Sequence, residues 1–407
     1  MVKDIDVTII IGANYGDEGK GRMTDYFASQ AIAEHKKTIV VCSNGGAQRG
    51  HTVQLDNGYR HIFHHLGSGT IAGADTYLPQ SFIVNPMIFM KEYNELLNSP
   101  LGKDTSLWPK IFVNPDCLIS TPFDMINNQI IEEHRTHRHG SCGVGIWETI
   151  LRQGARLYEM SQMTDEEMFN YLKWVRDTYS PKRLNDKKIK AISNQWKDIY
   201  FNDQLIRNYI QDFKSFCKII HYNPGSMLCE YDKIIFENGQ GLLIDEEKDP
   251  VYSTPSHTGL NWPLYILNNL LSIYIDIKFN IEICYITRSY YTRHGMGNLM
   301  YECDAKDISG LNLNTETNQF NKNQGIFRYG KLYYDELIER LKHHTDNSGI
   351  NSHLIKNYCY TNNLVITHCD ECLPPELVNT ELRSKEFLKV YKIFSPRRND
   401  KIIKELL

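Results

Sequence analysis

A glycine-rich segment with a single lysine follows the first apolar run of the chain. It reads GANYGDEGKGR from Gly12 to Arg22. Glycines allow backbone N–H groups to approach an anion closely, and a helix that starts after them adds partial positive charge at its N-terminus. The lysine supplies a point charge for a phosphate group that is being transferred. We therefore expect a phosphate-binding loop that comprises Gly16, Glu18, Gly19, Lys20, Gly21 and Arg22.

The loop is related to the P-loop of nucleotide-binding proteins, but the residue after Lys20 is glycine and not serine or threonine. A metal ion bound with the phosphates must then be held by another side chain. Asp17 is the candidate, because Mg²⁺ takes oxygen ligands that usually include one or two carboxylates. The competing interpretation is a plain strand–turn–helix in which glycine relieves strain and Asp17 caps the helix.

The full run GDEGKG is much rarer than a generic glycine-rich loop, and it resembles the opening motif of the adenylosuccinate synthetase family. Later segments resemble further motifs of that family in the same order. They are NGGAQRGHT at 44–52, GSCGVG at 140–145, FENGQG at 236–241, STPSHTG at 253–259, TRHGMG at 292–297 and THCD at 367–370. The resemblance extends from residue 6 to about residue 398, and region 157–222 is unmatched.

The resemblance implies a ligase that joins L-aspartate to carbon 6 of a purine nucleoside monophosphate. In that reaction Asp17 takes the N1 proton, the 6-oxygen attacks a γ-phosphate, and the aspartate amine then displaces phosphate. His51 would donate a proton or a hydrogen bond at the 6-oxygen, a role that suits a side chain titrating near neutrality. Lys20, Mg²⁺ and the loop amides would neutralise charge, with Mg²⁺ between Asp17, the Gly50 carbonyl and phosphate oxygens. Gly50 and Thr52 complete the phosphate side of the expected site.

The same resemblance assigns a set of residues to the purine monophosphate. They are Asn44, Gln48, Ser141, Cys142, Arg152, Gln240 and Ser256. Structural interpretations compete with these roles and with that of His51. A lone histidine is more often a hydrogen-bonding residue, Gln240 can cap a turn, and Ser141 and Ser256 can be turn residues. Arg152 is matched only by approximate position, to an arginine that reaches the partner's nucleotide in a dimer. A homodimer is therefore also implied.

The stretch expected to bind aspartate departs from the cellular pattern RRRRTGWLD. It reads NQGIFRYGKL from Asn323 to Leu332. The residues assigned to aspartate are Gln324, Gly325 and Arg328. The arginine can clamp a carboxylate with two hydrogen bonds. Ile326 and Phe327 replace arginines, one of which in the family also reaches the ribose 2′-OH, so selection against deoxyribose should weaken.

The segments NQGIFRYG, TRHGMG and GSCGVG are closer to the viral branch of the family, which joins aspartate to deoxyguanylate. Asp17 argues against this branch, because members of the branch often carry a smaller residue at that position. We hypothesise a GMP- or dGMP-directed enzyme, with IMP as the alternative acceptor. His368 and Asp370 are assigned to the donor base, and Asp370 can accept both N1–H and N2–H of guanine, which favours GTP over ATP. The alternative from another class is a guanine-nucleotide switch or a kinase that uses the loop without forming a C–N bond.

These segments must be positioned by a scaffold of strands and helices. Residues 6–12 and 38–42 are short apolar runs typical of strands buried on both faces, and further strand-like runs occupy 233–236, 281–287, 364–367 and 391–394. Helical-looking stretches lie between them, at about 19–33, 160–179 and 262–274. This alternation predicts an α/β fold with a mostly parallel central sheet flanked by helices. We interpret 157–222, which is polar and rich in aromatic residues, as a helical insertion in a single domain, 1–407.

The composition excludes several other classes. The 407 residues carry a formal net charge of −4, which gives no broad attraction to nucleic acid or to an anionic membrane. We expect no export signal at the start and no transmembrane helix, and so a cytoplasmic protein, in the host cytoplasm if the chain is viral. The ten cysteines are then reduced thiols. The CDEC spacing at 369–372 and the cluster of His61, His64 and His65 are interpreted as structural features.

Overall fold

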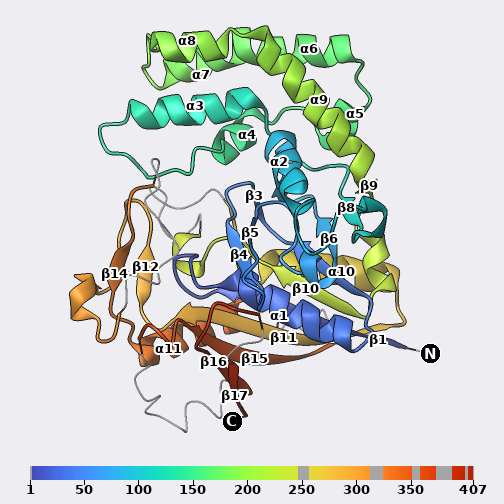
Figure 1. Cartoon of the computed structure of the whole chain (residues 1–407), viewed down its shortest axis with the longest axis vertical. Helices are drawn as coiled ribbons and strands as arrows, with labels where there is room; N and C mark the ends of the chain where they lie inside the picture. Colours follow the sequence, from blue (N-terminus) through green and yellow to red (C-terminus); the bar gives the residue numbers. More distant parts are fainter. Residues whose placement is uncertain are drawn as a thin grey trace.

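A mostly parallel sheet forms the centre of the computed structural model, which describes residues 2–245, 256–311, 324–350, 358–372, 387–398 and 402–406. Within these residues the main sheet has ten strands in the order β17-β16-β15-β11-β1-β10-β2-β6-β8-β9 (Figure 1). Each neighbouring pair is parallel except β16–β17, which is antiparallel. The predicted fold class is confirmed.

The strands of this sheet are β1 (Lys3–Gly12), β2 (Thr38–Cys42), β6 (Asp75–Leu78), β8 (Ile111–Val113), β9 (His221–Tyr222), β10 (Lys233–Glu237), β11 (Ile277–Arg288), β15 (Tyr358–Thr367), β16 (Lys389–Ile393) and β17 (Ile402–Leu406). Smaller sheets pair β3 (Gly45–Gly46) with β7 (Phe82–Ile83), β4 (His51–Gln54) with β5 (Arg60–Phe63), and β14 (Arg328–Gly330) with both β12 (Tyr291–Arg293) and β13 (Glu302–Cys303).

The strands β11 and β15 begin earlier than their apolar runs indicate. The first half of β11 alternates buried residues with exposed or half-buried ones, and its second half is fully buried. A strand covered on both faces along only part of its length shows a continuous apolar run only in that part. The pairing of β11 with β1 nevertheless extends from Lys3 to Gly12, so the polar half is held by the same hydrogen-bond ladder.

Helices cover both faces of the sheet, and alternate residues of β1 pack against helices on opposite faces. Alternate residues of a strand point to opposite faces. Val7 and Ile9 accordingly pack in one core with residues of α10 and α11, whereas Ile10 packs on the other face with Met23 and Phe27 of α1. The flanking helices are α1 (Lys20–Ala33), α2 (Pro86–Leu96), α10 (Asn261–Ile273) and α11 (Tyr334–Asn347).

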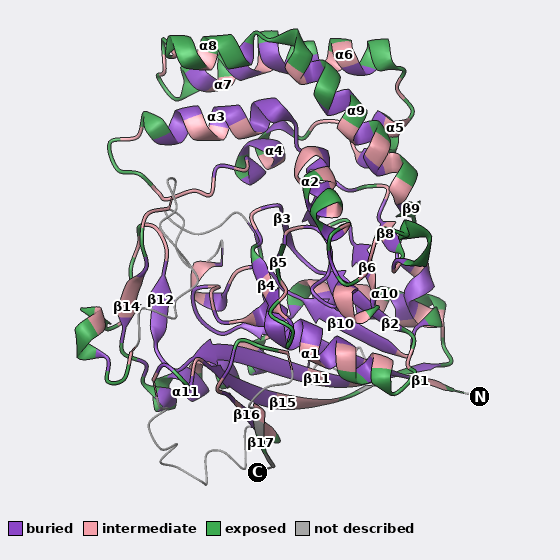
Figure 2. Cartoon of the chain, viewed as in Figure 1, coloured by how far each residue is buried: buried purple, intermediate pink, exposed green. Residues whose placement is uncertain are grey.

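A layer of helices stands over one side of the sheet (Figure 1). It contains α3 (Pro122–Glu133), α4 (Ile146–Arg152), α5 (Leu157–Ser161), α6 (Asp165–Trp174), a π-helical turn (Val175–Tyr179), α7 (Ser180–Asp186), α8 (Asn194–Tyr200) and α9 (Asp203–Ile219). These helices bury the sides that face one another and expose the outer sides (Figure 2). The stretch 160–179 is not one helix, because Thr164 and Glu167 form a capping box that starts α6 after a break.

None of the helices in the described part of the chain combines the length and the apolar character that a membrane span requires.

Candidate active site

Five of the segments singled out in the sequence begin at or follow the carboxyl ends of neighbouring strands. β15, β11, β1, β10 and β2 lie side by side in the sheet in this order. Ligands of open parallel sheets bind outside the carboxyl ends of the strands. The segments at the ends of these five strands are therefore brought to one edge of the sheet, although they are spread over most of the chain.

The phosphate loop leads into an uncapped helix. Gly19 is the N-cap of α1 with φ of 93°, and Gly16 has φ of 105°, both in the left-handed region that favours glycine. The helix has no side-chain cap and no acidic residue in its first turn. The first amides of a helix lack intrahelical partners and attract anions, so this terminus suits a phosphate.

Glu18 and Lys20 are buried together inside the loop. The Glu18 carboxylate accepts hydrogen bonds from the backbone N of Asn14 at 3.1 Å and of Gly16 at 2.7 Å. The Lys20 Nζ lies 3.4 Å from Glu18 Oε2 and donates to the Gly16 carbonyl at 2.5 Å. Burial raises the pKa of Glu18, and the charge of Lys20 opposes that rise. The lysine is thus held in place by the loop itself.

His51 is anchored by a buried carboxylate. Its Nδ1 lies 2.7 Å from Glu237 Oε1, and Arg49 Nη2 donates to Glu237 Oε2 at 2.7 Å. Ser68 also donates to Glu237 through its hydroxyl and its backbone N. Burial lowers the pKa of His51 to about 4, since the attraction of Glu237 is outweighed, and Arg49 lowers it further. The pKa of Glu237 is held below its usual value by Arg49 and His51 in spite of burial.

Glu237 and Arg49 had no role assigned from the sequence. Both lie in segments that carry the family resemblance, and Glu237 is the charged last residue of a strand whose five residues are all buried. A charge at the buried end of a parallel strand needs a partner. The sequence pattern at Glu237 therefore indicates a buried charge with a partner, but the identity of the partner depends on the fold.

The phosphate loop and His51 are in direct contact. A Cβ built on Gly21 would lie 2.9 Å from both the carbonyl carbon and the Cβ of His51. The half-buried Asp17 belongs to the same loop, and its backbone carbonyl accepts a 2.5 Å hydrogen bond from Arg288 Nε. Asp17 and Lys20 therefore belong to the loop that contacts His51, and the charge of Lys20 also lowers the pKa of His51.

Two glutamine side chains mark a polar space beside this loop. The amide atoms of Gln48 and Gln240 are buried, and none has a hydrogen-bond partner within the described residues. A Cβ on Gly45 would lie 2.9 Å from Gln48 Nε2 and 3.9 Å from Gln240 Nε2, so the two amides are near each other. Buried amides are normally hydrogen-bonded, and this pair therefore fits a polar ligand.

Asn44 and Ser256 lie next to that space. Asn44 Nδ2 donates to Ser256 Oγ at 2.7 Å, and Asn44 Oδ1 accepts from the backbone N of Gly239 at 2.8 Å. The residues at 253–255 of the same motif lie outside the described part of the chain. The two assigned side chains are adjacent, but each already uses part of its hydrogen-bonding capacity.

The loop at 140–145 reaches across to the segment at 292–297. A Cβ on Gly140 would lie 2.6 Å from Gly295 Cα, and Met296 N donates to the His139 carbonyl. Ser141 Oγ donates to Asn128 Oδ1 at 2.9 Å and accepts from Gly143 N. Burial raises the pKa of the Cys142 thiol. Ser141 serves the loop's own conformation here.

The structure does not bring Arg152 to the site. Its Nε and Nη2 donate to the two Asp124 oxygens at 2.8 Å each, and Nη2 also donates to the Ile119 carbonyl at 2.7 Å. Its Nη1 donates to Tyr171 Oη at 2.5 Å. All three guanidinium nitrogens are thus engaged inside the chain. Arg152 thus ties α3 to α6 within this chain, and its assigned contact with the partner's nucleotide remains a prediction.

Arg328 is at the edge of the site, on β14. It donates to the Gly295 and Gly297 carbonyls and to both oxygens of Glu302. The Gln324 carbonyl accepts from Gly295 N at 3.2 Å, and Gly325 has φ of 80°. A substrate carboxylate would therefore have to replace Glu302 on this arginine.

The donor-base segment, Thr367–Cys372, carries the two residues expected to bind the donor base and begins at the last residue of β15. His368 has φ of 59°, its Nδ1 lies 2.8 Å from Thr367 Oγ1, and its carbonyl accepts from Ser289 Oγ at 3.1 Å. Burial lowers the pKa of His368 well below its usual value, and Arg288 and Arg22 add to this. Asp370 is exposed.

Two residues of the expected phosphate side have other contacts. Arg22 donates through Nε and Nη2 to the Arg397 carbonyl at 3.0 and 2.6 Å, so it ties α1 to the C-terminal segment. Thr52 Oγ1 accepts from Arg60 Nη2 at 3.5 Å on the neighbouring strand.

The oxygen donors near the loop fit Mg²⁺. Asp17 offers a half-buried carboxylate, and Gly50, whose carbonyl is the second expected ligand, is exposed. Mg²⁺ is commonly held by one or two carboxylates together with substrate phosphates and water, so an all-protein cage is not needed. Within the described residues no group of three or more His, Cys, Asp or Glu side chains is arranged to hold a metal, and neither the CDEC spacing nor the histidine cluster forms such a group.

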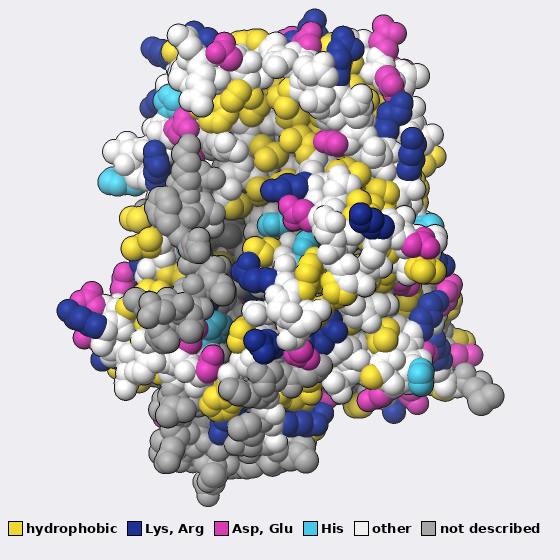
Figure 3. All heavy atoms as spheres, viewed as in Figure 1, with side chains coloured by type: hydrophobic (Ala, Val, Ile, Leu, Met, Phe, Trp, Pro, Cys, Tyr) yellow, Lys and Arg dark blue, Asp and Glu magenta, His cyan; other side chains and the backbone are white. Residues whose placement is uncertain are grey.

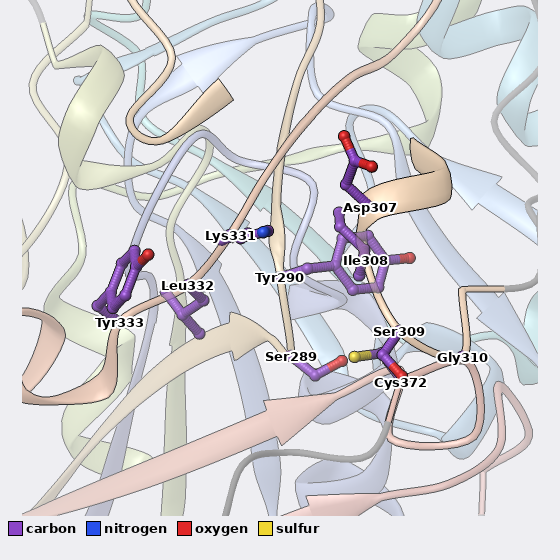
Figure 4. Close-up of a pocket in the computed structure, with 10 residues that line it drawn as sticks. All are labelled: Ser289, Tyr290, Asp307, Ile308, Ser309, Gly310, Lys331, Leu332, Tyr333 and Cys372. Atoms are coloured by element: carbon purple, nitrogen blue, oxygen red, sulfur yellow. The ribbon is translucent and has the colours of Figure 1, made fainter. Parts of the chain in front are cut away.

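A cavity of about 400 Å³ lies beside the donor-base segment (Figure 4). The residues that line it include Ser289, Tyr290, Lys331, Tyr333 and Cys372. On the face shown in Figure 3, hydrophobic side chains gather below the outer helices, and basic and histidine side chains lie beside the hollow under them.

The fold and the site together define an α/β protein with a candidate phosphate-binding loop beside a buried histidine–carboxylate pair. The chain belongs to the adenylosuccinate synthetase family, whose model, described as adenylosuccinate synthetase, matches residues 9–332, more than half of the chain.

Curated relatives include the adenylosuccinate synthetases of Acaryochloris marina and Borrelia duttonii. The first is 27% identical over 244 residues, which is 58% of this chain and 50% of the relative. The second is 29% identical over 251 residues, which is 58% of this chain and 52% of the relative. The matches thus span about half the length of these relatives.

Two solved structures are similar in fold. Fully ligated adenylosuccinate synthetase from Plasmodium falciparum has a TM-score of 0.65 at 18% identity, covering 89% of this chain and 77% of that chain. Cyanophage S-2L succinoaminodeoxyadenylate synthetase, bound to dGMP and to dATP as an energy donor, has a TM-score of 0.61 at 14% identity, covering 99% and 95%. At these identities the likeness shows the fold.

Proposed function

We propose that this chain is a ligase that joins L-aspartate to carbon 6 of a purine nucleoside monophosphate, with a nucleoside triphosphate as phosphate donor. The observation that carries the proposal is the contact of the phosphate loop with His51, across Gly21. A donor phosphate on the loop and a nucleobase oxygen beside His51 would then meet at one place. Membership of the adenylosuccinate synthetase family supports the same reaction.

The proposed reaction has two steps. Asp17 accepts the N1 proton and the 6-oxygen attacks the γ-phosphorus, so a P–O bond forms while the bond to the donor diphosphate breaks. The aspartate amine then attacks carbon 6, loses a proton, and phosphate leaves with the electrons of the C–O bond. Lys20 and the loop amides balance the charge of the transferring group. Bound Mg²⁺ supplies further neutralisation of phosphate charge.

His51 is neutral at pH 7 in the ligand-free protein, because its pKa is about 4. The short contact with Glu237 favours a proton on Nδ1 and leaves a lone pair on Nε2. A hydrogen bond donated by Nε2 to the 6-oxygen requires a second proton. The negative charge of entering phosphates favours its uptake, since a nearby opposite charge stabilises the imidazolium.

We infer that the acceptor is GMP or dGMP, with IMP as the alternative. Phe327 is buried, and its ring lies 3.9 Å from the ring of His294 at an interplanar angle of 30°. This position therefore presents a packed apolar ring and no hydrogen-bond donor for a ribose 2′-OH. The cyanophage neighbour was solved with dGMP. The retained Asp17 favours IMP.

We infer that GTP is the phosphate donor. Asp370 is exposed at the edge of the site, where its two oxygens can accept N1–H and N2–H of guanine. The cyanophage neighbour was solved with dATP, so ATP or dATP is the alternative. A competition assay in which ATP far outperforms GTP would overturn the inference.

A substrate matrix tests the proposal. Purified protein with Mg²⁺ and L-aspartate is assayed with IMP, GMP, dGMP and dIMP against GTP and ATP, and product mass is measured. The expected result is an aspartate adduct of GMP or dGMP with GTP. Turnover of IMP with no reaction of dGMP would show that the acceptor inference is wrong.

The same assay separates the ligase from a nucleotide switch or a kinase. A switch hydrolyses nucleotide at the same rate when aspartate and the acceptor are omitted, whereas the ligase requires both. The family also leads us to expect a homodimer, which size-exclusion chromatography with light scattering would test.

A further inference from the structure

The phosphate loop and the donor-base segment Thr367–Cys372 are separated by one strand. They follow β1 and β15, and β11 lies between these two strands. The end of β11 and the residues after it therefore occupy the space between the two segments. Arg288 is the last residue of β11, and Tyr290 follows shortly after.

A chain of buried hydrogen bonds connects the two segments through these residues. Arg288 Nε donates to the Asp17 carbonyl at 2.5 Å, and Arg288 Nη1 donates to Tyr290 Oη at 3.1 Å. Tyr290 Oη in turn donates to Glu371 Oε2. The exposed fractions are 3% for Arg288, 1% for Tyr290 and 6% for Glu371. Groups this buried are fixed by their bonds, since water cannot replace a lost partner.

A second connection runs beside the first. Thr367 Oγ1 donates to the Glu18 carbonyl at 2.8 Å, and Ser289 Oγ donates to the His368 carbonyl at 3.1 Å. His368 is held with a positive φ of 59°, which a non-glycine residue adopts only under constraint. The backbone that carries the assigned donor-base residues is thus bonded to both the loop and the Ser289 turn.

The guanidinium of Arg288 also has fixed packing. It lies over the ring of Tyr290, 5.6 Å from the centroid, and over the ring of Phe327 at 5.2 Å. Figure 4 shows Tyr290 at the wall of the cavity, with Ser289 and Cys372 beside it. The Arg288 guanidinium therefore packs against two aromatic rings while its Nε holds the Asp17 carbonyl.

We propose that Arg288 is a positioning residue that fixes the backbone at Asp17 and, through Tyr290 and Glu371, couples the donor-base segment to the phosphate loop. Glu371 is next to Asp370, so base binding at Asp370 restrains Glu371 and thereby the carbonyl of Asp17. The inference rests on the proposed function for the roles of Asp17 and Asp370. Small misplacements of a reacting group cost large factors in rate, so a defect should appear in kcat.

The first test compares two substitutions of the arginine. Arg288→Met is expected to lower kcat about 100-fold, with KM for aspartate within about threefold of wild type. The kcat of Arg288→Lys should be about tenfold higher than that of Arg288→Met, because an ammonium can still donate to the Asp17 carbonyl. Arg176→Met is the matched control, since Arg176 is 5% exposed and pairs with Asp177 and Asp203 in the helical layer. Wild-type kcat in Arg288→Met, or equal losses for Met and Lys, would overturn the proposal.

The second test needs no ligase activity. A double-mutant cycle between Arg288→Lys and Asp370→Asn is measured on the dissociation constant for magnesium–GTP, without acceptor or aspartate. If the segments are coupled, the loss of affinity in the double variant differs from the product of the two single losses by at least about fivefold. Losses that multiply would overturn the coupling. If wild-type protein forms no product, the proposed ligase function is wrong. The cycle still tests whether the two segments are coupled, because it measures only nucleotide binding.

A third variant guards against misfolding of the arginine substitutions. Tyr290→Phe keeps the buried ring and removes only the hydroxyl that joins Arg288 to Glu371. In this background the Arg288→Lys and Asp370→Asn losses should multiply. Persistence of the full coupling would show that Tyr290 does not carry it.

Discussion

His51 Nδ1 lies 2.7 Å from Glu237 Oε1, although the two residues are 186 positions apart in the chain. The pair is formed because β10 lies beside β2 in the sheet, and the chain beyond β2 turns back to place His51 over the end of β10. Arg49 occupies the other oxygen of the same carboxylate. The orientation of His51 is therefore set by a residue whose partners the local sequence does not indicate.

Glu237→Gln should lower kcat about 100-fold, the scale of a misplaced general acid or base. The amide is nearly isosteric, but it cannot balance Arg49 and hold Nδ1–H of His51 as a carboxylate does. Steady-state kinetics with the preferred acceptor measures the effect. Glu148→Gln is the control, since Glu148 is a buried carboxylate bonded to Arg183 in the helical layer. A kcat within about twofold of wild type would contradict a positioning role for Glu237.

Asp25→Asn should change the pH dependence of stability. Burial raises the pKa of Asp25 to about 6, which outweighs the attraction of Arg398 and Arg22. The folded carboxyl thus binds its proton more tightly than the unfolded one, whose pKa is near 3.8. Its contribution to stability is full below about pH 4 and is lost as pH rises through about 6, by an amount on the order of 3 kcal/mol.

Urea unfolding of wild type and Asp25→Asn between about pH 4 and pH 7 measures this contribution. The stability advantage of wild type over the variant should shrink as pH rises. An advantage that grows with pH would mean that the ion pair with Arg398 lowers the folded pKa instead.

Glu302→Gln should lower KM for aspartate about threefold, within the range of a solvent-exposed ion pair. Glu302 competes for Arg328 in the ligand-free structure, and its removal frees the guanidinium for a substrate carboxylate. Arg328→Met should raise the same KM at least about tenfold. Initial rates at varied aspartate measure both. An unchanged KM in Arg328→Met would show that the arginine binds no substrate carboxylate.

Gly21→Ala should reduce activity more than about tenfold and also lower the melting temperature. Alanine favours a helix over glycine by about 1 kcal/mol, but its Cβ would lie 2.9 Å from His51. His51 must shift, and the alignment of the loop with it is lost. Ser29→Ala on the same helix is the control. Full activity of Gly21→Ala would argue that the contact has no role in catalysis.

The sequence by itself determined the strands β1 and β2, the loop between β1 and α1, and the α/β class. These features depend on local patterns: a continuous apolar run, glycines that permit positive φ, and a helix that begins after them. Buried Lys20 and the uncapped start of α1 agree with that local interpretation. Local patterns also showed the end of β10, but not what Glu237 contacts.

Only the tertiary structure decided the partners. It paired Glu237 with His51 and Arg49, gave Arg152 to Asp124, and linked Arg288 to Asp17. The physical reason is that strand order sets which distant residues meet, and a buried charge takes the nearest compatible partner. Since β10 and β11 both flank β1 in the sheet, residues from distant parts of the chain complete the site around the loop.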